Sequence, residues 1–290
     1  MKIHKITLST SDVPEKLRNI PSPPKQLFVL GNDVNELLKR PCVTIIGSRK
    51  VSAYGRVVTT SLAGELARAG IVIISGLALG VDSLAHKAAL DAGGPTIAVL
   101  PTGLDRIYPA THQDLARQIV EKVGPLVTEY PEGTTVYKTN FIARNRIASG
   151  LGDALLITEA AEKSGTLHTA NFALEQGRPV LAVPGNITSP NSVGTNNLIK
   201  SGATPVTSVD DVFYVLGIKP EKAKKEAPKS SDPNEQILLD LIYAGIDDGA
   251  ELLEKSALDL RIFNQTLTML EIRGLIRPLG NNRWALIQTC

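Results

Sequence analysis

The sequence predicts an α/β protein in which a doubly wound, mostly parallel sheet is followed by a small C-terminal winged-helix domain. Short β-branched runs alternate with helical stretches from residue 27 to residue 216, the rhythm of repeated β-α-β units. Most of these runs are continuously apolar, as expected for strands that helices cover on both faces. Near the C-terminus, three helical segments precede two short strands joined by a Gly-Asn-Asn turn, which predicts the winged helix.

Eight strands are expected in chain order, of which the last is the weakest: 26–31, 43–47, 71–75, 96–100, 125–129, 154–158, 179–183 and 204–206. Helices are expected between them at 55–69, 82–92, 111–123 and 166–176. Each helix is followed by a glycine that can end it as a C-cap, namely Gly70, Gly93, Gly124 and Gly177. Ligands of such sheets bind at the carboxyl ends of the strands, so the loops that follow the strands are the candidate site.

The domain boundaries follow from composition. Residues 1–217 form the expected sheet domain, and residues 218–232 are a charged, proline-containing linker without apolar periodicity. Residues 233–290 form the expected winged helix, with helices at 234–243 and 249–255. Asp259 is expected to cap a third helix that places four apolar residues on one face: Leu260, Phe263, Leu267 and Leu270.

Charge and composition exclude several classes of protein. Residues 233–290 contain five Lys/Arg and eight Asp/Glu, a net charge of −3 that leaves +5 for residues 1–232. Any anion site must therefore come from local clustering of cations. Cys42 and Cys290 are too far apart to indicate a disulfide framework or a zinc site. No secretory signal and no apolar run of about 18 residues is present, so we expect a cytoplasmic protein without a membrane span.

Known catalytic signatures are also missing from the sequence. It contains no GxxxxGK[ST], HExxH or GxSxG motif, so no catalytic residue, metal ligand or cofactor is expected.

Two loops combine glycine, serine and charge immediately after a strand. The first, 47–55, contains Ser48 and Arg49, and its backbone N–H groups at a helix start predict an anion site. The alternative is a tight turn with a solvated arginine. The second, 75–86, contributes Ser75, Gly76 and Gly80, whose spacing does not fit GxGxxG. It also holds Asp82 and His86, which are either an acid–base pair or, more often in such sequences, a hydrogen-bonded lock on the loop.

A third loop opens a helix with Ser164, Gly165 and Thr166. The free N–H groups and positive dipole end of that helix favour a phosphate, unless Ser164 only caps the helix.

The fourth segment, around 141–150, is interpreted as a loop and concentrates cations near an aromatic residue. Lys138, Arg144 and Arg146 flank Phe141 and Asn145. Arginine and lysine bind backbone phosphates, and an aromatic face stacks on nucleobases, so this cluster predicts a site for a single-stranded nucleic acid. The alternative is that Phe141 belongs to the core and that the arginines pair with a nearby glutamate, for which the candidates are Glu129, Glu132 and Glu159.

Taken together, these segments resemble the DprA/Smf DNA-processing family. The resemblance is carried by GSR (47–49), SGLALGVDSLAHKAAL (75–90), PTGLDRIYP (101–109), EYPEG (129–133), FIARNRIASGL (141–151), EAAEKSGTLHTANFALEQGRPVLAVPG (159–185) and GTNNLIKSGA (194–203). It covers roughly residues 15–217 in a fixed order. The helical N-terminal domain of some relatives is not expected here, because only about 25 residues precede the first well-defined strand.

The resemblance implies an extended Rossmann-like domain that binds single-stranded DNA, forms a homodimer and loads a RecA-type recombinase during natural transformation. It assigns DNA contacts to Arg49, Lys138, Phe141, Arg144 and Arg146, and phosphate-lining turns to 76–80 and 164–166. Ile142 departs from the family, because many relatives have proline there.

Two other function classes are weighed. The GTLHTANFALEQGRPVLAV stretch is somewhat similar to lysine-decarboxylase-like phosphoribohydrolases, which cleave nucleoside monophosphates, but it lacks their Pro-Gly-Gly and catalytic glutamate. A recombinase adaptor without DNA affinity is disfavoured by the cation cluster. The acidic tail favours a protein-contact or dimer-supporting role for the winged helix, although Arg277 and Arg283 leave DNA contact by the wing open.

Overall fold

The structure is a computed structural model that describes residues 4–8, 12–122, 124–219 and 230–286. The chain divides into two compact units, Met1–Pro220 and Glu221–Cys290, each with its own hydrophobic core. The predicted linker, 218–232, falls largely on residues 220–229, which lie outside the described residues. No helix among the described residues is both long and apolar enough to cross a membrane.

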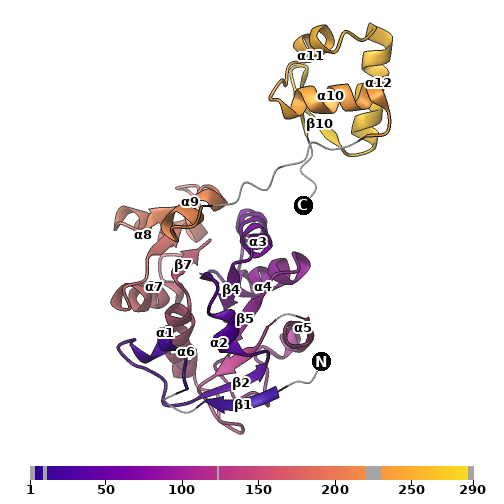
Figure 1. The fold of residues 1–290 in the computed structure, drawn as a ribbon. Helices are drawn as coiled ribbons and strands as arrows, with labels where there is room; N and C mark the ends of the chain where they lie inside the picture. The colour runs from indigo at the N-terminus through magenta and orange to yellow at the C-terminus, as the bar shows by residue number, and fades with distance from the viewer. Residues whose placement is uncertain (1–3, 9–11, 123, 220–229, 287–290) are drawn as a thin grey trace. The chain divides into compact units, whose positions relative to one another are not determined.

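The first unit is built on a nine-stranded sheet with the order β1-β2-β6-β5-β4-β3-β7-β8-β9 (Figure 1). Its strands are β1 (His4–Leu8), β2 (Leu27–Gly31), β3 (Cys42–Ile46), β4 (Val72–Ser75), β5 (Thr96–Val99), β6 (Leu126–Thr128), β7 (Ala154–Ile157), β8 (Val180–Ala182) and β9 (Thr204–Pro205). The strands from β3 to β9 are parallel, whereas β2 runs antiparallel to β6 and β1 antiparallel to β2. The mostly parallel sheet is thus confirmed, and all eight expected strands are present. The short edge strand β1 was not among the expected strands.

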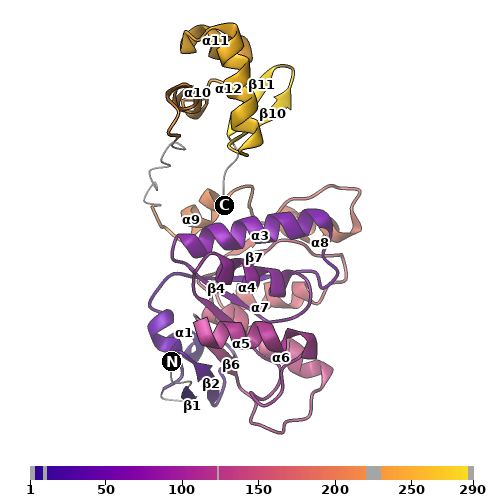
Figure 2. The ribbon, with the colours of Figure 1, turned by 90° about the vertical axis from the view of Figure 1, so that its right-hand side faces the viewer.

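Helices cover both faces of this sheet (Figures 1 and 2). One face carries α3 (Ala53–Arg68), α4 (Val81–Asp91) and α5 (Gln113–Lys122), and the other carries α1 (Glu15–Arg18), α6 (Lys138–Leu151) and α7 (Thr166–Glu175). Shorter helices are α2 (Val34–Leu37), α8 (Val193–Lys200) and α9 (Val209–Val215). Because side chains alternate along a strand, Val43 and Ile45 of β3 pack with α3 and α4, while Cys42 packs with α6.

The segment predicted as a loop around 141–150 lies inside helix α6, which corrects that expectation. The helix is buried along one side through Ile147, Ala148 and Leu151, together with Asn140 and Arg144. No side chain caps its N-terminus at Tyr137. Two polar residues within the buried side, and the missing cap, explain why the sequence shows no amphipathic helical pattern here.

Three of the four expected C-cap glycines have the left-handed backbone that such caps require. Gly70, Gly93 and Gly177 have φ of 84°, 68° and 66°. Gly124 has no such φ, and its role is different: a Cβ there would collide with the backbone carbonyl of Thr96, at the start of β5. This glycine therefore permits a close approach of two backbones.

The second unit follows the predicted order of three helices and a hairpin. It consists of α10 (Pro233–Tyr243), α11 (Gly249–Ser256), α12 (Leu260–Ile272), β10 (Ile276–Gly280) and β11 (Arg283–Leu286). The Asp259 carboxylate caps α12 by accepting from the Arg261 N–H at 2.9 Å. Phe263, Leu267 and Leu270 are buried as expected, but Leu260 is 59% exposed because it begins the first turn of the helix.

Candidate functional site

The site lies at the carboxyl edge of the parallel strands. The order β5-β4-β3-β7-β8-β9 is that of a doubly wound nucleotide-binding sheet, in which the direction of winding reverses between β3 and β7 and ligands bind beyond the strand ends. Backbone hydrogen bonds tie the loops together at this edge. The Ser48 carbonyl accepts from the Val81 N–H at 3.1 Å, and the Ser48 N–H donates to the Glu159 carbonyl at 2.8 Å.

Arg49, Phe141 and Tyr108 form a group of stacked side chains at this edge. The Arg49 guanidinium carbon is 5.3 Å from the centroid of the Phe141 ring, within cation–π range. The Tyr108 ring meets Phe141 edge-on, with centroids 5.1 Å apart and planes at 74°. Arg49 and Tyr108 are exposed and Phe141 is half-buried. A solvent-facing cation is therefore held against an aromatic surface by residues of three different loops or helices.

Lys138 is a second exposed cation near this edge, and Tyr108 is a residue of the edge that the sequence did not indicate. Lys138 is exposed in the first turn of α6, one helical turn before Phe141. Tyr108 was not proposed as a site residue from the sequence, and its only signal was the scarcity of aromatic residues, which are 4% of the chain.

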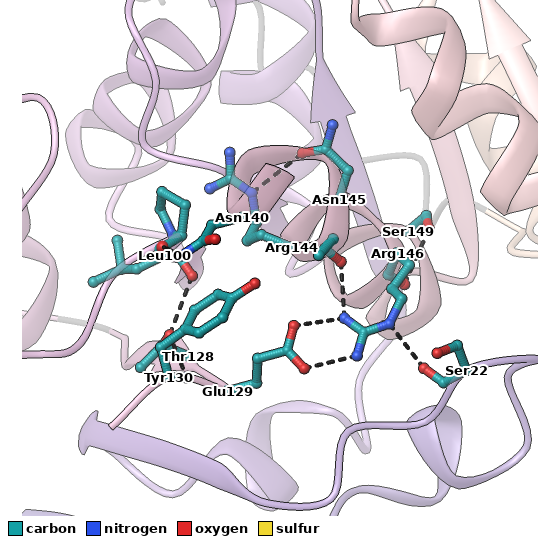
Figure 3. Close-up of polar contacts among 12 residues, drawn as sticks. Ser22, Leu100, Thr128, Glu129, Tyr130, Asn140, Arg144, Asn145, Arg146 and Ser149 are labelled. Atoms are coloured by element: carbon teal, nitrogen blue, oxygen red, sulfur yellow. Dashed lines mark hydrogen bonds and ion pairs between the residues drawn. The ribbon is translucent and has the colours of Figure 1, made fainter. Parts of the chain in front are cut away.

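Arg144 does not lie at the exposed edge, which corrects its assignment as a phosphate ligand. Its side chain is only 3% exposed, and Nη1 donates to the carbonyls of Gly76 and Val99 at the ends of β4 and β5. Its Nε donates to Oδ1 of Asn145 at 3.2 Å (Figure 3). Burial lowers the pKa of Arg144 to about 10, so it remains charged at neutral pH. Arg144 thus binds the ends of two of the protein's own strands, and Asn145 accepts a hydrogen bond from Arg144.

Arg146 points to the opposite side of α6 and is also engaged (Figure 3). Its two terminal nitrogens each donate to an oxygen of Glu129 at 2.7 Å, and Nε donates to the Ser22 carbonyl at 2.9 Å. The two side chains are 13% and 16% exposed. The alternative in which an arginine pairs with Glu129 is therefore observed for Arg146, and its contact with a phosphate stays a prediction.

The 75–80 loop is locked from within. The Ser75 hydroxyl donates to the Ile45 carbonyl at 2.6 Å, and Asp82 accepts from the N–H groups of Gly76 and Ala78 at 3.2 and 3.4 Å. Burial raises the pKa of Asp82. Because Ser75 and Gly76 are buried and the Gly76 N–H is taken by Asp82, they do not present donors to a phosphate, contrary to expectation.

Gly80 and His86 have structural roles of their own. Gly80 has φ of 79°, and a Cβ there would collide with the Ser48 carbonyl, so glycine is needed for the two loops to meet. His86 is buried and its Nδ1 lies 2.7 Å from the Thr96 hydroxyl. Burial lowers the pKa of His86 to about 3, which keeps the ring neutral. Asp82 holds the loop in place by hydrogen bonds, as the second interpretation predicted, but His86 contacts Thr96 and not Asp82.

An internal carboxylate occupies the start of α3. Glu159, which is 2% exposed, accepts from the Ser52 N–H at 2.9 Å and from the Ser52 hydroxyl at 2.5 Å. In sheets of this strand order the N-terminus of the helix after the first parallel strand binds a nucleotide phosphate. In this chain the Glu159 carboxylate fills that position.

The third predicted anion loop contains a local hydrogen-bonded turn. The Ser164 hydroxyl accepts from the Thr166 N–H at 3.2 Å and donates to the Thr166 hydroxyl at 2.9 Å. Gly165 is exposed, while Thr166 is buried. Ser164 therefore forms a local turn onto Thr166, while the N-cap position of α7 is Gly165, without a side-chain cap. Among the described residues no cluster of three or more His, Cys, Asp or Glu side chains could hold a metal ion.

Comparison with known proteins identifies close relatives of the first unit. The family model described as DNA recombination-mediator protein A matches residues 4–217. The chain is 41% identical over 214 residues to DNA processing protein DprA of Bacillus subtilis, which covers 74% of this chain and 71% of that protein.

Two solved structures share the fold. DprA of Streptococcus pneumoniae superposes with a TM-score of 0.68 at 39% identity, covering 72% of this chain and 74% of that chain. DNA processing protein A of Helicobacter pylori, whose structure is described as showing a unique single-stranded DNA binding mode, gives a TM-score of 0.66 at 34% identity, covering 73% of this chain and 95% of that chain.

Proposed function

Because the chain belongs to the DNA recombination-mediator protein A family, we propose that it binds single-stranded DNA at the carboxyl edge of its sheet. The observation that carries this proposal is the exposed Arg49 guanidinium held 5.3 Å from the Phe141 ring centroid, with Tyr108 beside the same ring. Arg49 and Lys138 contact backbone phosphates, and the aromatic rings receive unstacked bases. The H. pylori relative, described by its single-stranded DNA binding mode, supports the same ligand class.

The chemistry of this edge favours single strands of any sequence. Phosphate contacts carry no base information, and stacking accepts every base. A duplex keeps its bases stacked on one another, so it cannot use the rings at Phe141 and Tyr108. Each phosphate neutralised by a cation adds about 0.7 to the slope of log K against log salt for single strands.

Beyond binding, we propose that the protein mediates recombination by protecting the strand and loading a RecA-type recombinase on it, including during natural transformation, and that it acts as a homodimer. These roles are implied by the family. They are tested by whether the protein speeds recombinase assembly on single strands coated with a single-strand binding protein, and by its mass in solution.

For the C-terminal unit we propose a role in protein contact. The exposed side of α12 carries Ile262, Met269 and Ile272, which are 37%, 37% and 73% exposed. A helix that reads duplex DNA presents polar and basic side chains to the groove. Apolar residues on α12, in a tail with a net charge of −3, favour a protein surface instead.

The test of DNA binding is a fluorescence anisotropy titration of oligo(dT) over a salt series. Arg49→Ala and Lys138→Ala should each weaken binding and lower the salt slope by about 0.7, because each removes one phosphate contact. Lys122→Ala is the matched control, since Lys122 is an exposed cation at the end of α5, away from the carboxyl edge. Binding and salt slope equal to wild type in the Arg49→Ala/Lys138→Ala double variant would refute the assignment.

A further inference from the structure

A cavity of about 460 Å³ lies beside the start of α3, at the same edge of the sheet as Arg49. It is lined by Ser52 and Tyr54 from the α3 side and by residues of the 184–192 segment that follows β8, including Pro184, Asn186 and Ser189. Its volume is within the range of small-ligand sites. The cavity borders the predicted loop 47–55, but neither Tyr54 nor the 184–192 segment was among the site residues predicted from the sequence.

Tyr54 gives the cavity a fixed aromatic wall. Its side chain is 49% exposed, and its hydroxyl donates to the Pro184 carbonyl at 2.7 Å. This hydrogen bond joins the first turn of α3 to the segment after β8 and sets the orientation of the ring. A half-exposed ring whose polar end is already satisfied offers its face to a flat apolar partner.

A short cationic segment joins this cavity to the proposed DNA edge. Arg49, which contacts Phe141, is separated from Ser52 by only Lys50 and Val51, a distance of at most about 11 Å for an extended chain. Lys50 is exposed, and its carbonyl accepts from the Asn191 side chain at 3.1 Å, which fixes this segment against the 184–192 segment. Two aromatic surfaces are therefore linked by consecutive cationic residues.

We propose that the Tyr54 cavity is a second nucleobase subsite for the DNA strand that binds at Arg49 and Phe141. The strand passes over Lys50, which contacts a phosphate, and a base enters the cavity to stack on Tyr54. An aromatic wall, an exposed lysine and a second ring next to Arg49 match the alternating bases and phosphates of one strand. This inference rests on the proposed function.

The test compares Tyr54→Ala with wild type over a length series of oligo(dT). Affinity for long oligonucleotides should fall roughly 5- to 150-fold, the range expected for one lost base–aromatic stack. The two proteins should converge as the oligonucleotide becomes too short to reach both rings. Tyr54→Phe keeps the ring and should stay much closer to wild type. Leu174→Ala is the control, because Leu174 is 62% exposed in the last turn of α7 and distant from the carboxyl edge.

A second variant guards against indirect effects of Tyr54→Ala on folding. Lys50→Ala should lower the salt slope for long oligonucleotides by about 0.7 and leave that for the shortest ones unchanged. If Tyr54→Ala and Lys50→Ala bind long oligonucleotides like wild type while Arg49→Ala binds weakly, the subsite is refuted and the proposed function stands. If Arg49→Ala also binds like wild type, the proposed function fails as well.

Discussion

Replacing the buried Arg144 by methionine should destabilise the first unit strongly and in a pH-dependent way. Arg144 is 3% exposed and donates from Nη1 to the carbonyls of Gly76 and Val99. Its charge also lowers the pKa of the buried Asp82, against the larger effect of burial that raises it. Methionine retains much of the volume of arginine but removes both the donors and the charge.

The loss of unfolding free energy can be estimated from the buried groups that the substitution leaves without a partner. Two buried carbonyls lose a charged donor, and a buried carboxyl loses its stabilising cation. Removing one partner of a buried charged pair costs about 3–5 kcal/mol. This is a large part of the roughly 5–15 kcal/mol by which a domain is stable, so the variant should remain folded but with a much reduced margin.

Urea unfolding of the two proteins from neutral pH down to about pH 5 tests both size and sign. A carboxyl whose folded pKa is raised contributes stability that is present below its unfolded pKa and lost as pH rises through the folded pKa. Without Arg144 the pKa of Asp82 rises further, so the deficit of Arg144→Met should be largest at neutral pH and should shrink toward acidic pH. The added change Asp82→Asn should recover part of the deficit.

The control is Arg56→Met on the exposed side of α3, which should change stability by less than about 0.5 kcal/mol. A deficit for Arg144→Met of that same small size, or one that does not vary with pH, would refute the reasoning. The first outcome would mean that Arg144 is not an organising contact. The second would mean that Asp82 is not its electrostatic partner.

Three further predictions follow from single side chains. Phe141→Ala should weaken oligo(dT) binding by about 1–3 kcal/mol and Phe141→Trp should not, as measured by anisotropy, because stacking needs only a ring. Glu159→Ala should lower the unfolding free energy by about 1.5–3 kcal/mol, and inorganic phosphate should raise the Tm of this variant more than that of wild type by filling the vacated start of α3. Burial lowers the pKa of His86 from 6.5 to about 3, so the unfolded chain takes up a proton before the folded one does. The free energy of unfolding of the wild type should therefore decrease as the pH is lowered below 6.5. Urea titrations should therefore show a shallower acid slope for His86→Gln, by up to about 1.4 kcal/mol per pH unit.

The sheet could be predicted from the sequence because its strands are buried on both faces. Runs such as VTIIG and IVIIS are almost continuously apolar, short and rich in β-branched residues, which together favour buried strands over helices. The edge strand β1, HKITL, alternates polar and apolar residues and was missed for the opposite reason: an edge strand need not be apolar throughout. The order of the strands in the sheet could not be predicted from the sequence, because β3 and β7 are not neighbours in the chain and pair only in the tertiary fold.

The site was predicted only in part, because the sequence shows which residues are charged but not where their side chains point. Arg144 and Arg146 are two positions apart, which in a loop would let both reach one ligand. In a helix of 3.6 residues per turn they point about 200° apart, so Arg144 enters the protein and Arg146 faces Glu129. Phe141 and Lys138 are three positions apart and share a side of α6, which leaves Phe141 able to meet Arg49 from the loop after β3. The deciding fact was therefore the helical state of 138–151. Burying Asn140 and Arg144 on that helix removed the amphipathic pattern that would have revealed it, and the same two side chains tie α6 to the loops after β4 and β5, through the carbonyls of Pro101, Gly76 and Val99.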